Sequence, residues 1–245
     1  MPSPDTTMVV TACNRPAYLE QTLDSILARD RSGIKRIIVI EDSTNPEVAG
    51  LVARVLADVP HLFLQNSRNL GQIASIDRAY AEVDTPYIYH CEEDWVFPSS
   101  LFLEESRTVL SIRPDICAVM LRDWDEASHE QRIAIPETIA DVPVRVADPM
   151  AHRRWGAFSF NPGLRRLSDY AEHGPYSAIG PERDLSFHHK LRGFRLAYLE
   201  AGDVRHIGED ATVSIDELRR RRAPGFLWKS VKHRAQFLHF RLFGK

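Results

Sequence analysis

Three consecutive carboxylates, Glu92, Glu93 and Asp94, end a strand-like segment of the chain. Residues 85–91 before them form a β-prone run of the kind seen in buried strands. Because open α/β sheets bind ligands at the carboxyl ends of their strands, these acids are placed for binding. Adjacent carboxylates repel one another unless a cation lies among them, and Mg²⁺ takes one or two protein carboxylates together with substrate phosphates. The alternative is a solvated acidic turn, which is the usual state of a charge cluster.

Polar segments also follow the three strand-like segments that precede this one. Residues 11–15 follow the segment 7–11, residues 41–43 follow the segment 37–40, and residues 66–71 follow the segment 61–65. Any one of these segments could be a loop without a function. Four of them at one edge of a sheet would form a single crevice, which favours a ligand site.

Helix-like segments alternate with these strands in the first half of the chain. Apolar residues recur at helical spacing after Pro16, after Pro46 and over residues 73–83. This alternation predicts a parallel sheet with right-handed crossovers. The second half is mixed: we expect a helix at 101–110, a strand at 116–121, loops and edge strands over 123–154, a helix at 182–192 and a strand at 195–199. A last helix is expected over 226–243.

The composition is that of a soluble globular protein, with 44% hydrophobic and 27% charged residues among 245. No segment has the apolar length of a membrane span, the first residues do not resemble a signal peptide, and the three cysteines are scattered. We therefore expect a cytoplasmic protein, and we expect no nucleic-acid partner. The motifs GxGxxG, GxxxxGK[ST] and GxSxG are absent, which argues against a dinucleotide oxidoreductase, a P-loop enzyme and an α/β-hydrolase.

The charge is distributed unevenly along the chain. Residues 218–245 contain nine Lys or Arg and no Asp or Glu, whereas the whole chain has a net charge of −3. The last expected helix places apolar residues among these basic ones. Such a helix could contact an anionic membrane, as a peripheral protein does at the inner face, or pack on the domain or on a partner subunit.

Taken together, four segments resemble the opening of a GT-A-fold glycosyltransferase of family 2. They are residues 9–19, 37–43, 69–71 and 91–94, and the likeness resumes at 181–187 and 193–195. The resemblance implies an α/β, Rossmann-like GT-A fold with a mostly parallel central sheet flanked by helices, a mixed acceptor-side half and a C-terminal amphipathic helix. It implies one catalytic domain over 1–217, with a nucleotide-sugar-binding half (1–98) and an acceptor-binding half (99–217). The basic amphipathic segment 218–245 follows.

The resemblance also implies roles for individual residues in donor binding. Residues 11–15 would wrap the nucleotide, Asp42 would accept a hydrogen bond from the base or ribose, and Trp155 could stack on a sugar. The metal, Mg²⁺ or Mn²⁺, would be held by Asp94, with Glu92 and His206 as further ligands; Glu92 stands where the family has Asp. The full set of expected nucleotide-sugar contacts is Thr11, Ala12, Asn14, Arg15, Glu41, Asp42, Asn69, Gly71, Glu92, Glu93 and Trp155.

Glu182 stands where the family has its general base, with Asp184 as the second candidate. The reaction needs a carboxylate that accepts the proton of the attacking hydroxyl. The alternative for Glu182 is an acid that interacts with a helix dipole. Arg154 and Trp155 resemble the end of the QxxRW signature of processive synthases, but Ala151 replaces the glutamine and the segment precedes Glu182. This difference favours transfer of one sugar.

The expected function is metal-assisted, inverting transfer of a single sugar from a nucleotide-diphosphate sugar to a hydroxyl acceptor. The acceptor would be a lipid-linked intermediate or an intermediate of polysaccharide biosynthesis. Two alternatives stay open: a non-catalytic nucleotide-binding protein of the same fold, and a sugar nucleotidyltransferase. The second usually has a Gly-rich first loop, which residues 11–16 do not form.

Overall fold

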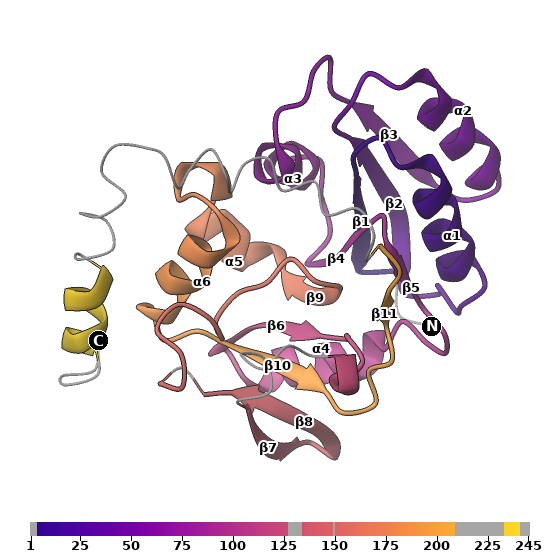
Figure 1. Cartoon of the computed structure of the whole chain (residues 1–245). Helices are drawn as coiled ribbons and strands as arrows, with labels where there is room; N and C mark the ends of the chain where they lie inside the picture. The colour runs from indigo at the N-terminus through magenta and orange to yellow at the C-terminus, as the bar shows by residue number, and fades with distance from the viewer. Residues whose placement is uncertain (1–3, 127–133, 149, 209–232, 241–245) are drawn as a thin grey trace.

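The computed structural model describes residues 4–126, 134–148, 150–208 and 233–240 (Figure 1). The strands are β1 (Thr6–Ala12), β2 (Ile34–Glu41), β3 (His61–Gln65), β4 (Tyr87–Glu92), β5 (Trp95–Val96), β6 (Ile116–Met120), β7 (Ala134–Ile139), β8 (Val142–Ala147), β9 (Gly163–Arg166), β10 (Arg195–Leu199) and β11 (Arg205–His206). The α-helices include α1 (Pro16–Leu27), α2 (Pro46–Val55), α3 (Gln72–Tyr80), α4 (Leu103–Ile112), α5 (Leu167–His173) and α6 (Glu182–Lys190).

Nine of these strands form one sheet in the order β3-β2-β1-β4-β9-β6-β10-β8-β7. Strands β1 to β4 are mutually parallel, and β6 pairs in parallel with β10. Strands β8 and β9 run opposite to the others. The two-residue strands β5 and β11 form a separate antiparallel pair. The expected α/β architecture with a mostly parallel central sheet is therefore confirmed.

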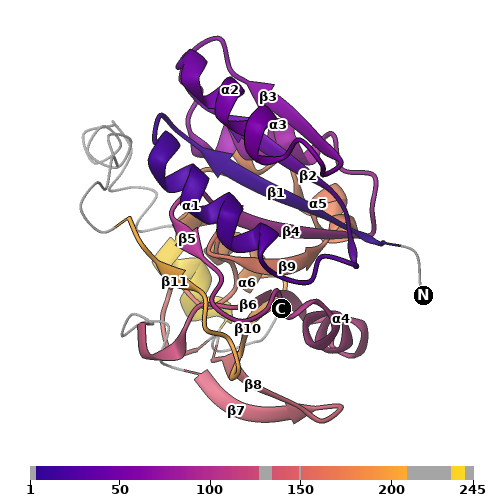
Figure 2. The ribbon, with the colours of Figure 1, turned by 90° about the vertical axis from the view of Figure 1, so that its right-hand side faces the viewer.

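Helices cover both faces of the sheet (Figures 1 and 2). Met8 and Val10 of β1 pack with the apolar faces of α1, α2 and α4, whereas Val9 packs with α3 on the other face. This alternation is what a strand buried on both faces requires, because successive side chains point to opposite sides. Pro16 and Pro46 each start a helix, as expected, and Asn45 caps α2 by accepting a hydrogen bond from the amide of Glu47 at 3.0 Å.

Strand β9 and helix α5 fall in a region for which the sequence suggested no elements. β9 lies in the middle of the sheet between β4 and β6, yet it contains Arg165 and Arg166 rather than an apolar run. Arg165 is 2% exposed, donates to the carbonyl of Ser159 at 3.0 Å and lies over the Phe158 ring. Packing of the arginine stem and its charge against aromatic rings thus replaces the usual aliphatic strand residues.

Only part of the expected last helix falls within the described residues. Residues 233–240 are helical, and they pack beside α6 (Figure 1). The His233 ring lies 4.5 Å from the Phe187 ring, and the Nζ atom of Lys190 lies 5.6 Å from the centroid of Phe237. Leu238 is exposed. The expected boundary at residue 217 lies outside the described residues, and the division into donor and acceptor halves stays a prediction.

Candidate active site

The carboxyl ends of β1, β2 and β4 lie together, as the sequence predicts. Thr11 pairs with Glu92 across the β1 and β4 strands, and Ala12 pairs with Glu41 across β1 and β2. The polar segments that follow these strands therefore share one edge of the sheet. This is the edge at which open α/β sheets bind ligands.

Arg15 is a positive charge within the acidic cluster Glu92–Asp94. Its Nε atom lies 3.0 Å from Oε1 of Glu93, and its Nη2 atom donates to Oδ2 of Asp94. Burial raises the pKa of Glu93 to about 7, although the Arg15 charge opposes this shift. The expected repulsion among the three carboxylates is thus reduced by Arg15, which itself belongs to the predicted nucleotide-sugar-binding residues.

Asp94 also contacts His206, which the chain brings from far along the sequence. The Nε2 atom of His206 lies 3.1 Å from Oδ2 of Asp94. The pairing of β5 with β11 sets this distance, because Trp95 faces His206 in that pair and the amide of Ile207 donates to the Asp94 carbonyl at 2.9 Å. A carboxylate and an imidazole meet at one point as a result.

Gly208 makes this close approach possible. A Cβ atom added at Gly208 would lie 2.8 Å from the Cβ atom of Asp94 and would overlap its carboxylate. Any other residue would therefore displace Asp94 or the segment that carries His206.

Both carboxylate oxygens of Glu92 are held by the protein. Gln72 donates to Oε1 at 2.5 Å, and the indole of Trp95 donates to Oε2 at 3.2 Å. Burial raises the pKa of Glu92 to about 8, and the charges of Asp94 and Glu182 add to this shift. The charge of Glu182 therefore reaches the acidic cluster, although the two residues come from different halves of the chain.

The donor set suits a hard divalent cation with few protein ligands. In the part of the chain that the structure describes, no group of three His, Cys, Asp or Glu side chains is arranged to hold a metal. Asp94 and His206 do converge, and an oxygen and an imidazole nitrogen are ligands for Mn²⁺. Two protein ligands are enough for a cation that is otherwise bound by substrate phosphates. The residues therefore fit the expected metal, with Glu92 beside them.

Asp42 organises the loop beneath the expected nucleotide. Its Oδ1 atom accepts hydrogen bonds from the side chain of Asn66 and the amide of Leu70, each at 2.7 Å, and its Oδ2 atom accepts one from the amide of Gly71 at 2.8 Å. Asn69 donates to the Asp42 carbonyl at 3.1 Å. Both carboxylate oxygens of Asp42 therefore have hydrogen-bond partners within the chain. The expected hydrogen bond from a base or ribose to Asp42 stays a prediction.

The loop after β1 is anchored by Glu41. Its Oε1 atom accepts from the amide of Asn14 at 2.7 Å, and its Oε2 atom is buried without a hydrogen-bond partner. Asn14 has a φ of 55°, so the chain turns sharply just before Arg15. This turn points Arg15 back toward Glu93 and Asp94. Thr11 and Ala12 lie at the end of β1, where the expected nucleotide loop begins.

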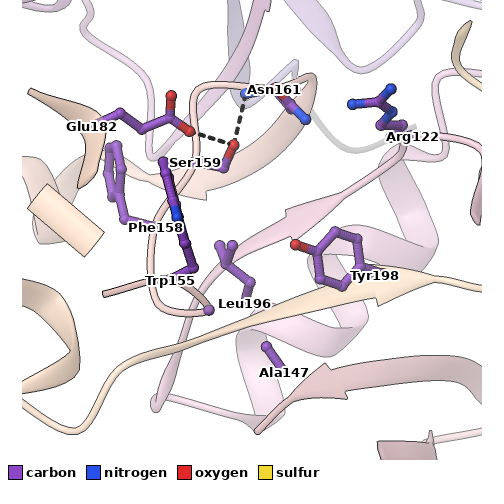
Figure 3. A pocket seen from close by; sticks show the side chains of 10 residues that line it. Arg122, Ala147, Trp155, Phe158, Ser159, Asn161, Glu182, Leu196 and Tyr198 are labelled. Carbon is purple, nitrogen blue, oxygen red and sulfur yellow. Dashed lines mark hydrogen bonds between the residues drawn. The ribbon is translucent and has the colours of Figure 1, made fainter. Parts of the chain in front are cut away.

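A cavity of about 400 Å³ contains the candidate base, and Arg122 in its wall lies over the ring of Trp95, which follows the acidic cluster in the chain (Figure 3). Trp155 and Glu182 lie at one end and Arg122 at the other, with Tyr198 below. The lining residues are Arg122, Ala147, Trp155, Gly156, Phe158, Ser159, Asn161, Glu182, Leu196 and Tyr198. The cavity thus combines aromatic faces with one carboxylate and one guanidinium, which is suitable for a polar ring.

Glu182 is held in place at the first turn of α6. Its Oε1 atom accepts from the hydroxyl of Ser159 at 2.7 Å and from the amide of Phe160 at 3.3 Å. Burial raises the pKa of Glu182, and these hydrogen bonds oppose the shift. Asp184 is 7% exposed, is not among the cavity-lining residues and lies 4.0 Å from Nε of Arg183. The geometry favours Glu182 over Asp184 as the base.

Trp155 is fixed in the cavity wall by a buried lysine. Lys190 donates to the carbonyl of Trp155 at 2.5 Å and to the carbonyl of His152. Burial lowers the pKa of Lys190 to about 8. Trp155 therefore faces the cavity from a loop that α6 holds, as stacking on a sugar would require, although the stacking itself stays a prediction.

The model of glycosyl transferase family 2 matches residues 7–141, which is more than half of the chain. The chain belongs to this family. The resemblance described from the sequence is therefore confirmed. Among proteins with curated descriptions, none matches the chain in sequence.

Solved glycosyltransferase structures share the fold at low sequence identity. The mannosyltransferase PcManGT from Pyrobaculum calidifontis, solved with GDP-Man and Mn²⁺, is 14% identical, with a TM-score of 0.63 over 98% of this chain and 65% of that one. TarS from S. aureus is 13% identical, with a TM-score of 0.61 over 98% of this chain and 72% of that one. GalNAc-T7, solved with UDP, GalNAc and Mn²⁺, is 14% identical, with a TM-score of 0.61 over 86% and 46%.

Several residues of this glycosyltransferase site carried no signal in the sequence. Ser159 and Arg122 line the cavity, Gln72 holds Glu92, and Gly208 admits Asp94. Gly208 lies two residues after the predicted metal ligand His206, and a glycine so close to a ligand could have indicated a close approach of the backbone. The others meet the site only through long-range packing.

Proposed function

We propose that the protein transfers one sugar from a nucleotide-diphosphate sugar to a hydroxyl acceptor with inversion at the anomeric carbon. The acceptor oxygen attacks the anomeric carbon while the bond to the diphosphate oxygen breaks, and Glu182 accepts the hydroxyl proton. A direct displacement of this kind needs one base opposite the leaving group. The hexosyl nature of the sugar belongs to the same proposal.

The observation that carries this proposal is the position of Glu182 in the cavity beside the acidic cluster. Its carboxylate is held by Ser159 and Phe160, and a raised pKa makes it a stronger base than an ordinary glutamate. Its charge acts on Glu92 at the carboxyl edge of the sheet. Arg122 of the same cavity lies over the Trp95 ring, and the Trp95 indole donates to Glu92, which supports a base and a donor site that serve one substrate pair.

Asp94 and His206, with Glu92 beside them, would hold Mg²⁺ or Mn²⁺ at the donor diphosphate. When bound, the metal would neutralise the charge that develops on the departing diphosphate. Arg15, which pairs with Asp94 and Glu93, would also face the diphosphate. Two of the solved relatives were solved with Mn²⁺, and three structures were solved with a nucleotide or nucleotide sugar, which supports this assignment.

Thermal shift with UDP, GDP, dTDP and CMP, each with and without Mn²⁺, tests donor binding. The proposal predicts stabilisation by one nucleotide only when the metal is present. Donor turnover separates the alternatives. A non-catalytic binding protein would be stabilised in the same way but would release no sugar, and a sugar nucleotidyltransferase would turn over nucleoside triphosphate and sugar phosphate instead.

We also propose a cytoplasmic location with peripheral contact to an anionic membrane through residues 225–245, close to a lipid-linked or polysaccharide acceptor. The nine basic residues of 218–245 support this proposal. No helix within the described residues is long and apolar enough to cross a membrane. Liposome sedimentation with and without residues 225–245 is the test, and equal pelleting would contradict the membrane contact.

A further inference from the structure

Arg122 brings a positive charge into the cavity that contains Glu182 (Figure 3). It lies two residues after β6, and backbone hydrogen bonds hold the chain on both sides of it. The amide of Asp123 donates to the carbonyl of Val204 at 2.9 Å, and the amide of Val204 donates to the carbonyl of Leu121 at 3.0 Å. The side chain of Arg122 is therefore presented to the cavity from a fixed position.

The guanidinium of Arg122 has unused hydrogen-bond donors. Within the described residues it forms no hydrogen bond and no ion pair, and its Nε atom is buried without a partner. It contacts an aromatic face instead, with its Cζ atom 5.3 Å from the centroid of the Trp95 ring. This contact stabilises the charge but leaves the N–H groups without acceptors. Because buried donors without acceptors are costly, a ligand that supplies oxygen atoms would bind favourably here.

The carboxylate in the cavity is not the partner of Arg122. Glu182 is the other charged residue that lines the cavity, and it lies at the opposite end (Figure 3). Its Oε1 atom accepts hydrogen bonds from the hydroxyl of Ser159 and the amide of Phe160. The cavity therefore presents a base at one end and a cation at the other.

The acidic cluster Glu92–Asp94 has cations of its own. Arg15 and His206 form the ion pairs of this cluster within the described residues. Trp95 is 2% exposed, and its indole donates to Glu92 while its ring contacts Arg122. Arg122 thus adjoins the cluster through an aromatic ring and is available to a group within the cavity.

We infer that Arg122 binds an anionic group, a carboxylate or a phosphate, carried by the acceptor substrate. The inference rests on the proposed function and names the chemical class of its acceptor. A guanidinium presents paired N–H donors that match two oxygens of either group. An acceptor sugar between the two ends of the cavity would place its attacking hydroxyl at Glu182 and its anionic group at Arg122. The aromatic rings of Trp155 and Tyr198 line the space between them (Figure 3).

Three sugars that differ in charge test the inference. Methyl glucuronide carries a carboxylate, glucose 1-phosphate carries a phosphate, and methyl glucoside is neutral. Each is titrated by calorimetry into the full chain after saturation with Mn²⁺ and the nucleoside diphosphate selected by thermal shift, so that the donor site is occupied. At least one charged sugar should bind about tenfold or more tightly than methyl glucoside, as a charge-assisted contact would produce. Preference for methyl glucuronide identifies a carboxylate and preference for glucose 1-phosphate a phosphate, and both outcomes support the inference.

Two variants at one position separate binding from packing. Arg122→Gln should weaken binding of the preferred charged sugar by about tenfold and leave methyl glucoside binding unchanged. Arg122→Lys keeps the charge without the paired donors, so its affinity should lie between those of the wild type and Arg122→Gln. If Arg122 only packed on Trp95, both variants would lose stability without a change in the ratio of charged to neutral affinity.

The matched control is Arg54→Gln on α2. The Arg54 side chain is 63% exposed and pairs with Glu20, so this substitution should change none of the titrations. Raising the salt concentration should reduce the charge preference of the wild type and have less effect on Arg122→Gln.

Other outcomes overturn the inference. Equal affinity of the wild type for charged and neutral sugars, including failure of all three to bind, would show that Arg122 binds no anionic group; pairing with an acid outside the described residues would have this result. An unchanged charge preference in Arg122→Gln would assign the anion to another residue. Weaker nucleotide binding in Arg122→Gln would assign Arg122 to the donor.

The proposed function fails in a different way. Absence of metal-dependent nucleotide binding in the wild type would contradict it. The three sugars are then titrated into the nucleotide-free chain, where the charge preference and its loss in Arg122→Gln are still measured. The two failures are therefore distinguishable.

Discussion

The imidazole of His206 lies 3.1 Å from the carboxylate of Asp94, although the two residues belong to different halves of the chain. The short antiparallel pair of β5 and β11 sets this contact. The assignment of a metal site rests on the contact between Asp94 and His206. Asp94 is at the same time the partner of Arg15. A protein cation and a bound metal would therefore compete for one carboxylate.

Gly208→Ala should displace Asp94 while leaving both candidate metal ligands, Asp94 and His206, chemically unchanged. The added Cβ atom would lie 2.8 Å from the Cβ atom of Asp94, so we expect about tenfold weaker Mn²⁺ affinity and a loss of about 1–3 kcal/mol in stability. Gly50→Ala on α2 is the control, because its added Cβ atom meets nothing within 4 Å. It should raise the unfolding free energy by about 0.5–1 kcal/mol. Equal Mn²⁺ affinity in both variants would contradict the packing argument.

Arg15→Met should expose the competition between arginine and metal. Removal of the guanidinium leaves Glu93 and Asp94 without their cation, and we expect a loss of about 2 kcal/mol, reduced from the buried-pair value because these side chains are 11–17% exposed. Mn²⁺ should then stabilise the variant more than it stabilises the wild type. Denaturant titration with and without Mn²⁺ measures both effects. A smaller stabilisation by Mn²⁺ in the variant would count against the competition.

Glu182→Gln should abolish transfer while donor binding survives. Loss of a general base lowers kcat by about 10²–10⁴-fold, and the matched variant Glu172→Gln, at an exposed position on α5, should retain activity. Burial raises the pKa of Glu182 above 4.5. The base form is lost as the pH falls, so wild-type kcat should fall on the acid side with a midpoint above pH 4.5. Full activity in Glu182→Gln would remove Glu182 from the mechanism.

Lys190→Met should destabilise the loop that carries Trp155. The substitution leaves the half-buried carbonyls of His152 and Trp155 without their donor, at a cost of about 1–2 kcal/mol. The pKa of Lys190 is lowered from 10.5 to about 8, so the unfolded chain binds more protons between these pH values. Wild-type stability should therefore rise relative to Lys190→Met between pH 8 and 10.5. A constant difference across that window, measured by urea unfolding, would disprove the assigned titration; exposed Lys35→Met serves as control.

The first half of the fold could be predicted from sequence because each element there carries a local signal. Pro16 and Pro46 mark helix starts, and β1 to β4 are short apolar segments followed by polar residues. The position of Glu92, Glu93 and Asp94 at the sheet edge follows from that order alone. Parallel strands buried on both faces leave little ambiguity.

The second half could not be predicted in the same way because its signals are tertiary. β9 is central in the sheet, yet Arg165 is buried there only because the Phe158 and Phe160 rings lie against it. Contacts between distant segments also supply the hydrogen bonds that the Asp42 carboxylate accepts. The same is true of the close approach of Gly208 to Asp94. The resemblance to family 2 identifies the candidate base and metal ligand, but only the folded chain shows what holds them.

The account depends most on the cation at Asp94 and His206. Electron paramagnetic resonance of free Mn²⁺, in the presence of the selected nucleoside diphosphate, measures binding directly. We expect Mn²⁺ to bind equally to the wild type and to the control His61→Ala, whose histidine is exposed. Mn²⁺ should bind about tenfold more weakly to His206→Ala and not measurably to Asp94→Ala. Equal Mn²⁺ binding by all four proteins would contradict it.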